Sequence, residues 1–125
     1  MGRMSSYGNP ADDYKETALS LDEHLIQHPA ATYLARACGD SMEGVGIFDR
    51  DLLIIDRSLE PRNGDVVVAA IDGELTCKLL DTKHQVLKAA NPKYPPIAIG
   101  DEMELLIEGV IMASIRYHRH PICSP

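Results

Sequence analysis

Short apolar runs, separated by polar residues, glycines and prolines, recur along the chain from Thr32 onward. Runs of this length bounded by turn-forming residues are typical of β-strands. The last run is long and contains Gly109, where a strand can bend. Several short strands with little helix indicate a mainly β domain. The predicted strands are residues 32–38, 52–55, 66–71, 75–80, 85–90 and 105–115.

A tight hairpin is the strongest local signal. Asp72-Gly73 lies between two apolar runs, and Asp-Gly is a preferred pair for a two-residue hairpin turn. The hairpin places Lys78 inside the second strand. Alternation along that strand puts Lys78 on one face and its neighbours Cys77 and Leu79 on the other.

One short helix is predicted before the strands. Ser20 and Glu23 form a capping-box pattern, in which the serine side chain binds an amide of the first helical turn. Pro29 stops this helix after one or two turns. The preceding residues 1–19 are polar, contain glycine and proline and show no period, so we expect a flexible N-terminal arm. Residues 20–125 then form one domain with a single core.

The charge balance restricts the possible partners. The chain has 19 acidic residues against 12 lysines and arginines, which gives a formal net charge of −7. Proteins that bind the phosphate backbone of nucleic acid need clustered lysine and arginine. We therefore expect no direct sequence-specific DNA binding, and any contact with nucleic acid would run through another protein.

Cysteine usage and hydropathy bear on metal sites and location. Cys38, Cys77 and Cys123 form no CxxC pair, which favours reduced thiols over a disulfide framework or a zinc site. The aspartates at 49, 51 and 56 lack the remaining ligands of a cation loop, so we expect no metal and no cofactor. No apolar run reaches the roughly 18 residues of a membrane span, and the start lacks the apolar core of a secretory signal. These features predict a cytoplasmic protein with no membrane association.

Ser41 and Lys78, 37 positions apart, are the candidate reactive residues. A serine hydroxyl is a poor nucleophile at neutral pH unless a neighbouring group takes its proton. A lysine can do so where apolar surroundings favour its neutral form, and Ser-Lys pairs are a known variant of the Ser-His arrangement. Taken separately, neither residue is specific, because most serines after glycine form turns and most strand lysines face solvent.

The blocks around these residues make the pattern specific. The sequence resembles the LexA-type self-cleaving serine peptidases, and among them most closely the UmuD-type SOS mutagenesis proteins, from about residue 10 to residue 121. The resemblance implies a single LexA-like peptidase domain over residues 20–125 that follows a mobile arm. The matching blocks, all in register, are Asp13-Tyr14, HPAATY at 28–33, GDSM at 39–42, DLLIID at 51–56, GDVV at 64–67 and Lys78.

The resemblance also implies roles for individual residues. Ser41 would be the nucleophile, and Lys78, neutral when active, the general base. The backbone amides of Asp40 and Ser41 would donate to the developing oxyanion, an interaction that supplies much of acyl-transfer catalysis. The Asp40 side chain is expected to cap the bend, and Met42 to pack beside the site.

For function, the resemblance implies a homodimer that in its processed form serves an error-prone Y-family translesion DNA polymerase in the SOS response. A RecA nucleoprotein filament would promote the self-cleavage that produces this form. Unpaired strand edges invite pairing, so residues 105–115 are the expected dimer edge. Residues 116–120 form a small basic tail, expected to be solvated or at an interface.

The chain departs from the family pattern at the expected cleavage position. Family members cleave an Ala-Gly or Cys-Gly bond upstream of the serine, but the corresponding position falls near Ser5-Ser6, where neither pair occurs. Cys38-Gly39 adjoins the nucleophile and is expected inside the fold rather than as substrate. We therefore expect the chain to correspond to the processed form or to a version that lacks its target bond. Arg50 stands where relatives carry glycine, which costs about 1 kcal/mol if the position needs a positive φ.

Two other functions are compatible with a Ser-Lys pair. The peptidase domain of a LexA-like or phage-type repressor would follow a DNA-binding domain, and an upstream helix-turn-helix would reveal it. A signal peptidase would require a membrane anchor, which the hydropathy does not predict.

Overall fold

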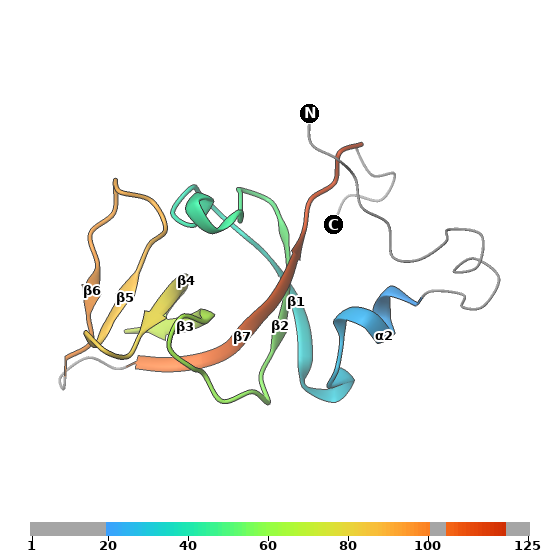
Figure 1. Ribbon diagram of the computed structural model, residues 1–125, viewed down its shortest axis with the longest axis horizontal. Coiled ribbons are helices and arrows are strands. Elements are labelled where there is room, and N and C mark those ends of the chain that lie inside the picture. Colours follow the sequence, from blue (N-terminus) through green and yellow to red (C-terminus); the bar gives the residue numbers. More distant parts are fainter. Residues whose placement is uncertain (1–19, 101–104, 120–125) are drawn as a thin grey trace.

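The computed structural model describes residues 20–100 and 105–119, and over these residues the chain forms one antiparallel sheet of seven strands (Figure 1). The prediction of a mainly β domain with one short α-helix is confirmed, whereas the predicted arm at 1–19 lies outside the described residues. The strand order is β1-β2-β7-β3-β4-β5-β6. The strands are β1 (Thr32–Arg36), β2 (Leu52–Asp56), β3 (Val66–Ile71), β4 (Glu74–Asp81), β5 (Val86–Lys88), β6 (Ile97–Ala98) and β7 (Leu105–Ile115). The helical elements are α2 (Leu21–Leu25) and the 3-10 turns η1 (Pro29–Ala31) and η2 (Glu43–Val45). Within the described part of the chain, no helix is long and apolar enough to cross a membrane.

The long strand β7 curves through the middle of the sheet (Figure 1). Its first half, residues 105–110, pairs with β3, and its second half, residues 110–115, pairs with β2. The register shifts in both pairings, and one shift lies beside Gly109, where a bend was predicted. A Cβ atom at Gly109 would lie 2.5 Å from Cγ2 of Ile55, so only glycine fits this crossing. Because β7 is interior and β1 and β6 are the outermost strands, the expectation that residues 105–115 offer an unpaired edge is wrong.

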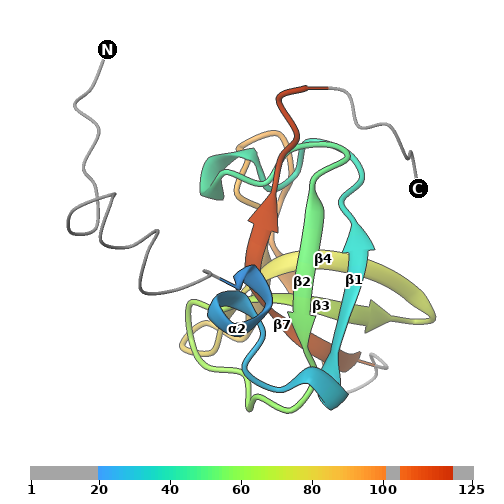
Figure 2. The same ribbon diagram turned by 90° about the vertical axis from the view of Figure 1, so that its right-hand side faces the viewer.

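The sheet is strongly twisted, so that its two parts face each other across a buried core. Figure 2 shows β3 and β4 running across β1 and β2 rather than alongside them. One cluster of buried side chains lies between these two parts and includes Met42, Leu53, Ile55 and Val68. A second cluster covers the other face of β3 and β4: Val67, Ala69, Leu80, Leu87 and Val110. Since neighbours along β3 and β4 belong to different clusters, alternate side chains enter alternate cores.

The hairpin and the helix start both follow their local sequence. Asp72 and Gly73 have φ values of 49° and 88°, the positive pair that a two-residue turn of this kind requires. β3 and β4 are joined there, with Ile71 paired to Glu74. At α2, the Ser20 side chain accepts a hydrogen bond from the Glu23 amide at 3.3 Å. Both predictions are confirmed, although α2 has only five residues and buries none of them.

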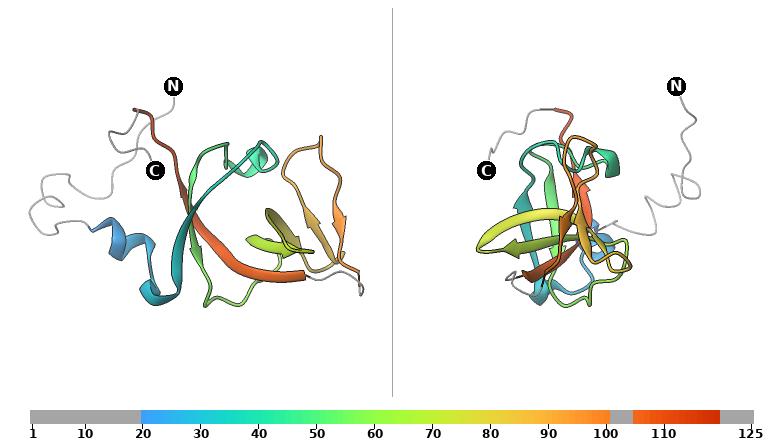
Figure 3. Two further views of the ribbon diagram at one scale, coloured as in Figure 1. Left: turned by 180° about the vertical axis from the view of Figure 1, so that it is seen from behind. Right: turned by 90° about the vertical axis from the view of Figure 1, so that its left-hand side faces the viewer.

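The observed strands differ from the prediction mainly at β1, β5 and β6, whereas β2 and β4 only extend by one residue beyond their predicted limits. β1 ends at Arg36 instead of continuing to residue 38, because Ala37 binds the loop at Asp51 through a backbone hydrogen bond of 2.8 Å. β5 covers three residues rather than 85–90, since Ala90 turns away to meet the Ser41 loop. β6 was not predicted, because two residues carry too little pattern. Seen from behind, η2 lies beside the loop that joins β5 and β6 (Figure 3).

Candidate active site

Ser41 lies in the loop that leads from β1 to η2, where the backbone bends sharply. Gly39 takes a φ of 87°, and its amide donates to Asp49 Oδ1 at 2.8 Å. Met42, only 3% exposed, anchors the loop in the first core cluster, as expected. The serine is therefore held between a glycine bend and a buried side chain, at the end of a strand.

Lys78 reaches Ser41 from the middle of β4. Its Nζ atom lies 3.3 Å from Ser41 Oγ and 3.2 Å from the Cys77 carbonyl oxygen, to which it donates. The lysine side chain is half-buried, on the strand position that pairs with Val67. A separation of 3.3 Å permits proton transfer between a hydroxyl and an amine in a resting site. The structure thus brings together the two side chains that the sequence singled out.

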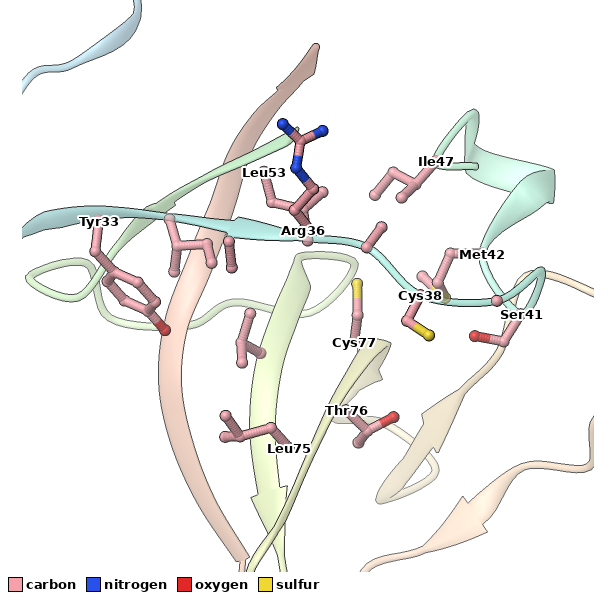
Figure 4. A pocket seen from close by; sticks show the side chains of 15 residues that line it. Tyr33, Arg36, Cys38, Ser41, Met42, Ile47, Leu53, Leu75, Thr76 and Cys77 are labelled. Atoms are coloured by element: carbon pink, nitrogen blue, oxygen red, sulfur yellow. The ribbon is translucent and has the colours of Figure 1, made fainter. Parts of the chain in front are cut away.

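A pocket of about 230 Å³ opens beside Ser41. Figure 4 shows Ser41, Cys38 and Met42 along one side, with Thr76 and Cys77 of β4 across from them. Most of the remaining lining is apolar and comes from β1, β2 and β3: Tyr33, Ala35, Leu53, Ile55 and Val68. An apolar hollow next to a hydroxyl and an amine suits a peptide segment with small or apolar side chains.

Asp40 has a different role from the one expected. Asp49, rather than Asp40, caps the bend at Gly39. The Asp40 carboxylate instead accepts hydrogen bonds from the Tyr94 hydroxyl and from Lys93 Nζ, the latter at 3.1 Å. The Tyr94 bond, then the Lys93 bond, hold the pKa of the Asp40 carboxyl below its usual value.

Ala90 and Asn91 form a part of the site that the sequence did not predict. The Ala90 amide donates to the Ser41 carbonyl at 2.7 Å, and Asn91 Nδ2 donates to the Asp40 carbonyl at 2.9 Å. In the sequence, Asn91-Pro92 indicates only the end of the strand predicted at 85–90. The contact joins positions 51 apart, and no local pattern indicates which loop a turn will meet.

The two described cysteines lie in contrasting surroundings, and both are free. Burial raises the pKa of the Cys77 thiol to about 11, although the nearby Lys78 charge partly opposes the shift. Cys38 and Gly39 belong to the folded domain, as expected. Both residues are exposed on its surface rather than buried in its interior. Cys123 lies outside the described residues.

The aspartates that resembled a cation loop each have protein partners instead. Asp51 accepts from the Phe48 amide and from Arg116, and Asp56 accepts from Ser58 and lies 2.7 Å from His28 Nδ1. Across residues 20–100 and 105–119, no group of three or more His, Cys, Asp or Glu side chains could hold a metal ion.

The basic segment after β7 is not a free tail at its start. Arg116 binds the buried Asp51 carboxylate at 2.8 Å, and its guanidinium lies 4.0 Å from the centre of the Phe48 ring. Arg116 is nevertheless 42% exposed and residues 117–119 are exposed, which agrees with the expectation that the segment is solvated. His120 lies outside the described residues.

A mainly β domain that sets a serine beside a lysine at the edge of an apolar pocket has the architecture of a LexA-type serine peptidase. Residues 3–112 match the family described as Peptidase S24-like, and the chain belongs to this family.

Individual relatives agree with this assignment. Protein SamA of Salmonella typhimurium is 40% identical over 116 residues, which cover 92% of this chain and 81% of SamA. Protein MucA of Escherichia coli is 38% identical over 121 residues, covering 95% of this chain and 82% of MucA. The LexA repressor of Xylella fastidiosa is 36% identical over 121 residues, but these cover only 57% of that longer protein. The resemblance to LexA-type peptidases, and among them to UmuD-type proteins, is confirmed.

Proposed function

We propose that this protein is a UmuD-type SOS mutagenesis subunit with a Ser-Lys peptidase site, in which Ser41 is the nucleophile and Lys78 the general base. The observation that carries the proposal is the 3.3 Å separation of Ser41 Oγ and Lys78 Nζ beside an apolar pocket. Membership of the Peptidase S24-like family supports it.

The hydrogen bonds of Lys78 suit a base. A neutral amine has two N–H donors and one lone pair. One N–H donates to the Cys77 carbonyl at 3.2 Å, which orients the nitrogen and leaves its lone pair for the Ser41 hydroxyl. Protonation of the Lys78 amine would abolish its ability to accept the serine proton, because an ammonium group has no lone pair.

The reaction then proceeds in two balanced halves. As Ser41 Oγ attacks the scissile carbonyl, its proton passes to the Lys78 amine, and the oxyanion is stabilised by the backbone amides of Asp40 and Ser41. Lys78 returns this proton to the departing amine, which leaves an ester on Ser41. A water molecule, deprotonated by Lys78, hydrolyses that ester and restores both side chains.

The biological assignment follows the same relatives. SamA, ImpA and MucA match 92%, 82% and 95% of this chain. As such a subunit, the protein would form a homodimer, meet the RecA nucleoprotein filament and join a Y-family polymerase. The net charge of −7 supports contacts with proteins rather than with DNA.

The proposal is tested by cleavage in trans. We expect the protein to cut full-length MucA whose own nucleophilic serine has been replaced by alanine, with fragments followed on gels and mapped by mass spectrometry. Ser41→Ala and Lys78→Met should each lower the rate about 10³-fold or more. Equal cleavage by Ser41→Ala would overturn the nucleophile assignment, and equal cleavage by Lys78→Met would overturn the role of Lys78.

A second candidate is the peptidase domain of a LexA-like repressor. The match to the LexA repressor supports it, because that match covers 95% of this chain and only 57% of LexA. The full coding sequence separates the two functions, since a repressor carries an upstream helix-turn-helix.

A further inference from the structure

One segment holds the backbone on both sides of Ser41 in place. Ala90 and Asn91, in the loop between β5 and β6, donate to the Ser41 and Asp40 carbonyls at 2.7 and 2.9 Å. These two carbonyls belong to the peptide units on either side of the serine Cα atom. The loop therefore helps to fix the orientation of both units from 49 and 51 residues away along the chain, and its 2.9 Å bond to the Asp40 carbonyl is shorter than the 3.3 Å bond that the Glu43 amide makes to the same oxygen.

The geometry of a peptide gives this contact a chemical consequence. In a planar trans peptide, the C=O and N–H bonds point in opposite directions. The Asp40 carbonyl and the Ser41 amide belong to one such unit. When Asn91 Nδ2 binds the carbonyl oxygen, it also fixes the direction in which the Ser41 N–H points.

The Asn91 side chain is itself held in place. Its Oδ1 atom accepts a hydrogen bond from the Lys93 amide at 3.0 Å, which leaves Nδ2 to face Asp40. The loop also packs tightly against η2, because Gly44 donates to the Ala90 carbonyl at 2.7 Å and a Cβ at Gly44 would lie 2.5 Å from that oxygen. The donor is thus fixed by its own turn and by the element that follows the serine.

We propose that Asn91 is a positioning residue for the peptidase reaction, and that it aims the Ser41 amide at the developing oxyanion by holding the Asp40 carbonyl. The inference rests on the function proposed above. Asn91 touches no reacting atom and acts through the Asp40–Ser41 peptide unit. Its contribution is to the transition state, since the amide donates most strongly when the carbonyl oxygen of the substrate becomes charged.

Asparagine is the residue type that this role requires. Aspartate has the same shape and would keep the acceptor for the Lys93 amide, but it has no donor for the Asp40 carbonyl. A carboxylate at that place would instead repel the carbonyl oxygen and turn the peptide unit. Asn91→Asp is therefore a nearly isosteric variant that reverses one contact and retains the other.

The matched control lies two residues further on. Lys93 also binds Asp40, but it contacts the carboxylate from an exposed position and leaves the peptide unit alone. Lys93→Gln removes the positive charge of this contact, in the same loop and against the same partner residue. It should leave turnover unchanged, because the Asp40 carbonyl is still held by Asn91.

The experiment measures kcat and KM separately on a quenched fluorescent peptide that contains one Ala-Gly bond. We expect Asn91→Asp and Asn91→Ala to lower kcat roughly 10- to 100-fold, somewhat less than the loss of a whole oxyanion donor. KM and the thermal unfolding midpoint should stay close to those of the wild type, because a group that acts only in the transition state leaves ground-state binding intact.

The possible outcomes separate this inference from the proposed function. If Ser41→Ala is inactive while Asn91→Asp turns over like the wild type, the positioning role is overturned and the peptidase assignment stands. If the Asn91 variants lose stability and raise KM along with the fall in kcat, the loop is merely structural and the inference fails. The inference also fails if kcat falls as far in Lys93→Gln as in the Asn91 variants. If Ser41→Ala cleaves the peptide as well as the wild type, the proposed function fails and the inference fails with it.

Discussion

Cys77 and Lys78 are neighbours on β4, but their side chains lie in different environments. The Cys77 thiol faces the first core cluster, where burial raises its pKa to about 11. Its carbonyl oxygen accepts from Lys78 Nζ on the other side of the strand. Alternation along β4 therefore isolates the thiol and presents the amine to Ser41, as the predicted alternation of faces requires.

The two described thiols should differ sharply in reactivity. We expect iodoacetamide at about pH 8 to alkylate the exposed Cys38 and to spare Cys77, because only the thiolate reacts and burial keeps the Cys77 thiol protonated. Peptide mapping by mass spectrometry follows each site separately. Cys77 should react only after urea is added, and Cys38→Ser controls for modification elsewhere. Native labelling of Cys77 as rapid as that of Cys38 would contradict this.

Strand β2 is bounded at both ends by buried aspartates. Asp51, 2% exposed, precedes the strand and binds Arg116, which follows β7. Asp56, 1% exposed, ends the strand and binds Ser58 and His28. Asp51 thus connects β2 to the segment after β7, and Asp56 connects β2 to the segment before β1. Arg50, just before the strand, adopts a φ of 74°, the left-handed conformation that favours glycine and on which the predicted cost at this position depends.

The lowered pKa values of these two aspartates predict that acid destabilises the folded protein. The Arg116 hydrogen bond lowers the pKa of Asp51, and the Ser58 and then His28 hydrogen bonds lower the pKa of Asp56. The unfolded chain therefore binds more protons in acid than the folded one, and the stabilisation present above about pH 4 is lost as the pH falls.

Urea unfolding measures this effect. We expect the midpoint to drop between about pH 5 and about pH 2, and to drop less in Asp56→Asn, where the titrating group is absent. Glu60→Gln, at an exposed position, is the control for removing one negative charge. An acid dependence in Asp56→Asn as steep as in the wild type would show that Asp56 does not contribute.

The twisted sheet determines what the whole molecule presents to partners. Its outermost strands are β1 and β6, and several large apolar side chains remain at least half exposed, among them Leu34, Leu75 and Leu106. Leu75 and Leu106 both pair with Ala70 from opposite sides, so they lie in one row across three strands. Apolar rows of this kind on a surface favour association with another protein.

We expect the protein to be a homodimer in solution, in keeping with the function proposed above and with the exposed apolar row of Leu75 and Leu106. Sedimentation equilibrium at micromolar concentration should give twice the chain mass, and Ser41→Ala should give the same value, because the serine lies in a pocket and not on an outer strand. A monomer at these concentrations would contradict the dimer. A change in association for Ser41→Ala alone would show that the site lies at the interface.

Much of the fold could be predicted because its signals are local. The Asp72-Gly73 turn, the Ser20 cap and the limits of β3 and β7 each depend on residues next to one another in the chain. The candidate pair was found in a different way: the spacing of Ser41 and Lys78 alone was unspecific, and only the family blocks around them singled them out.

The remaining features depend on contacts that no neighbouring residues encode. The hydrogen bond from Asn91 to Asp40, the ion pair of Arg116 with Asp51 and the interior position of β7 each join segments that meet only when the sheet twists over its core. Apolar alternation specifies which face of a strand is buried, but it leaves open which strand becomes its neighbour. Folding resolves that choice, because loop closure and side-chain packing are settled together across the whole domain.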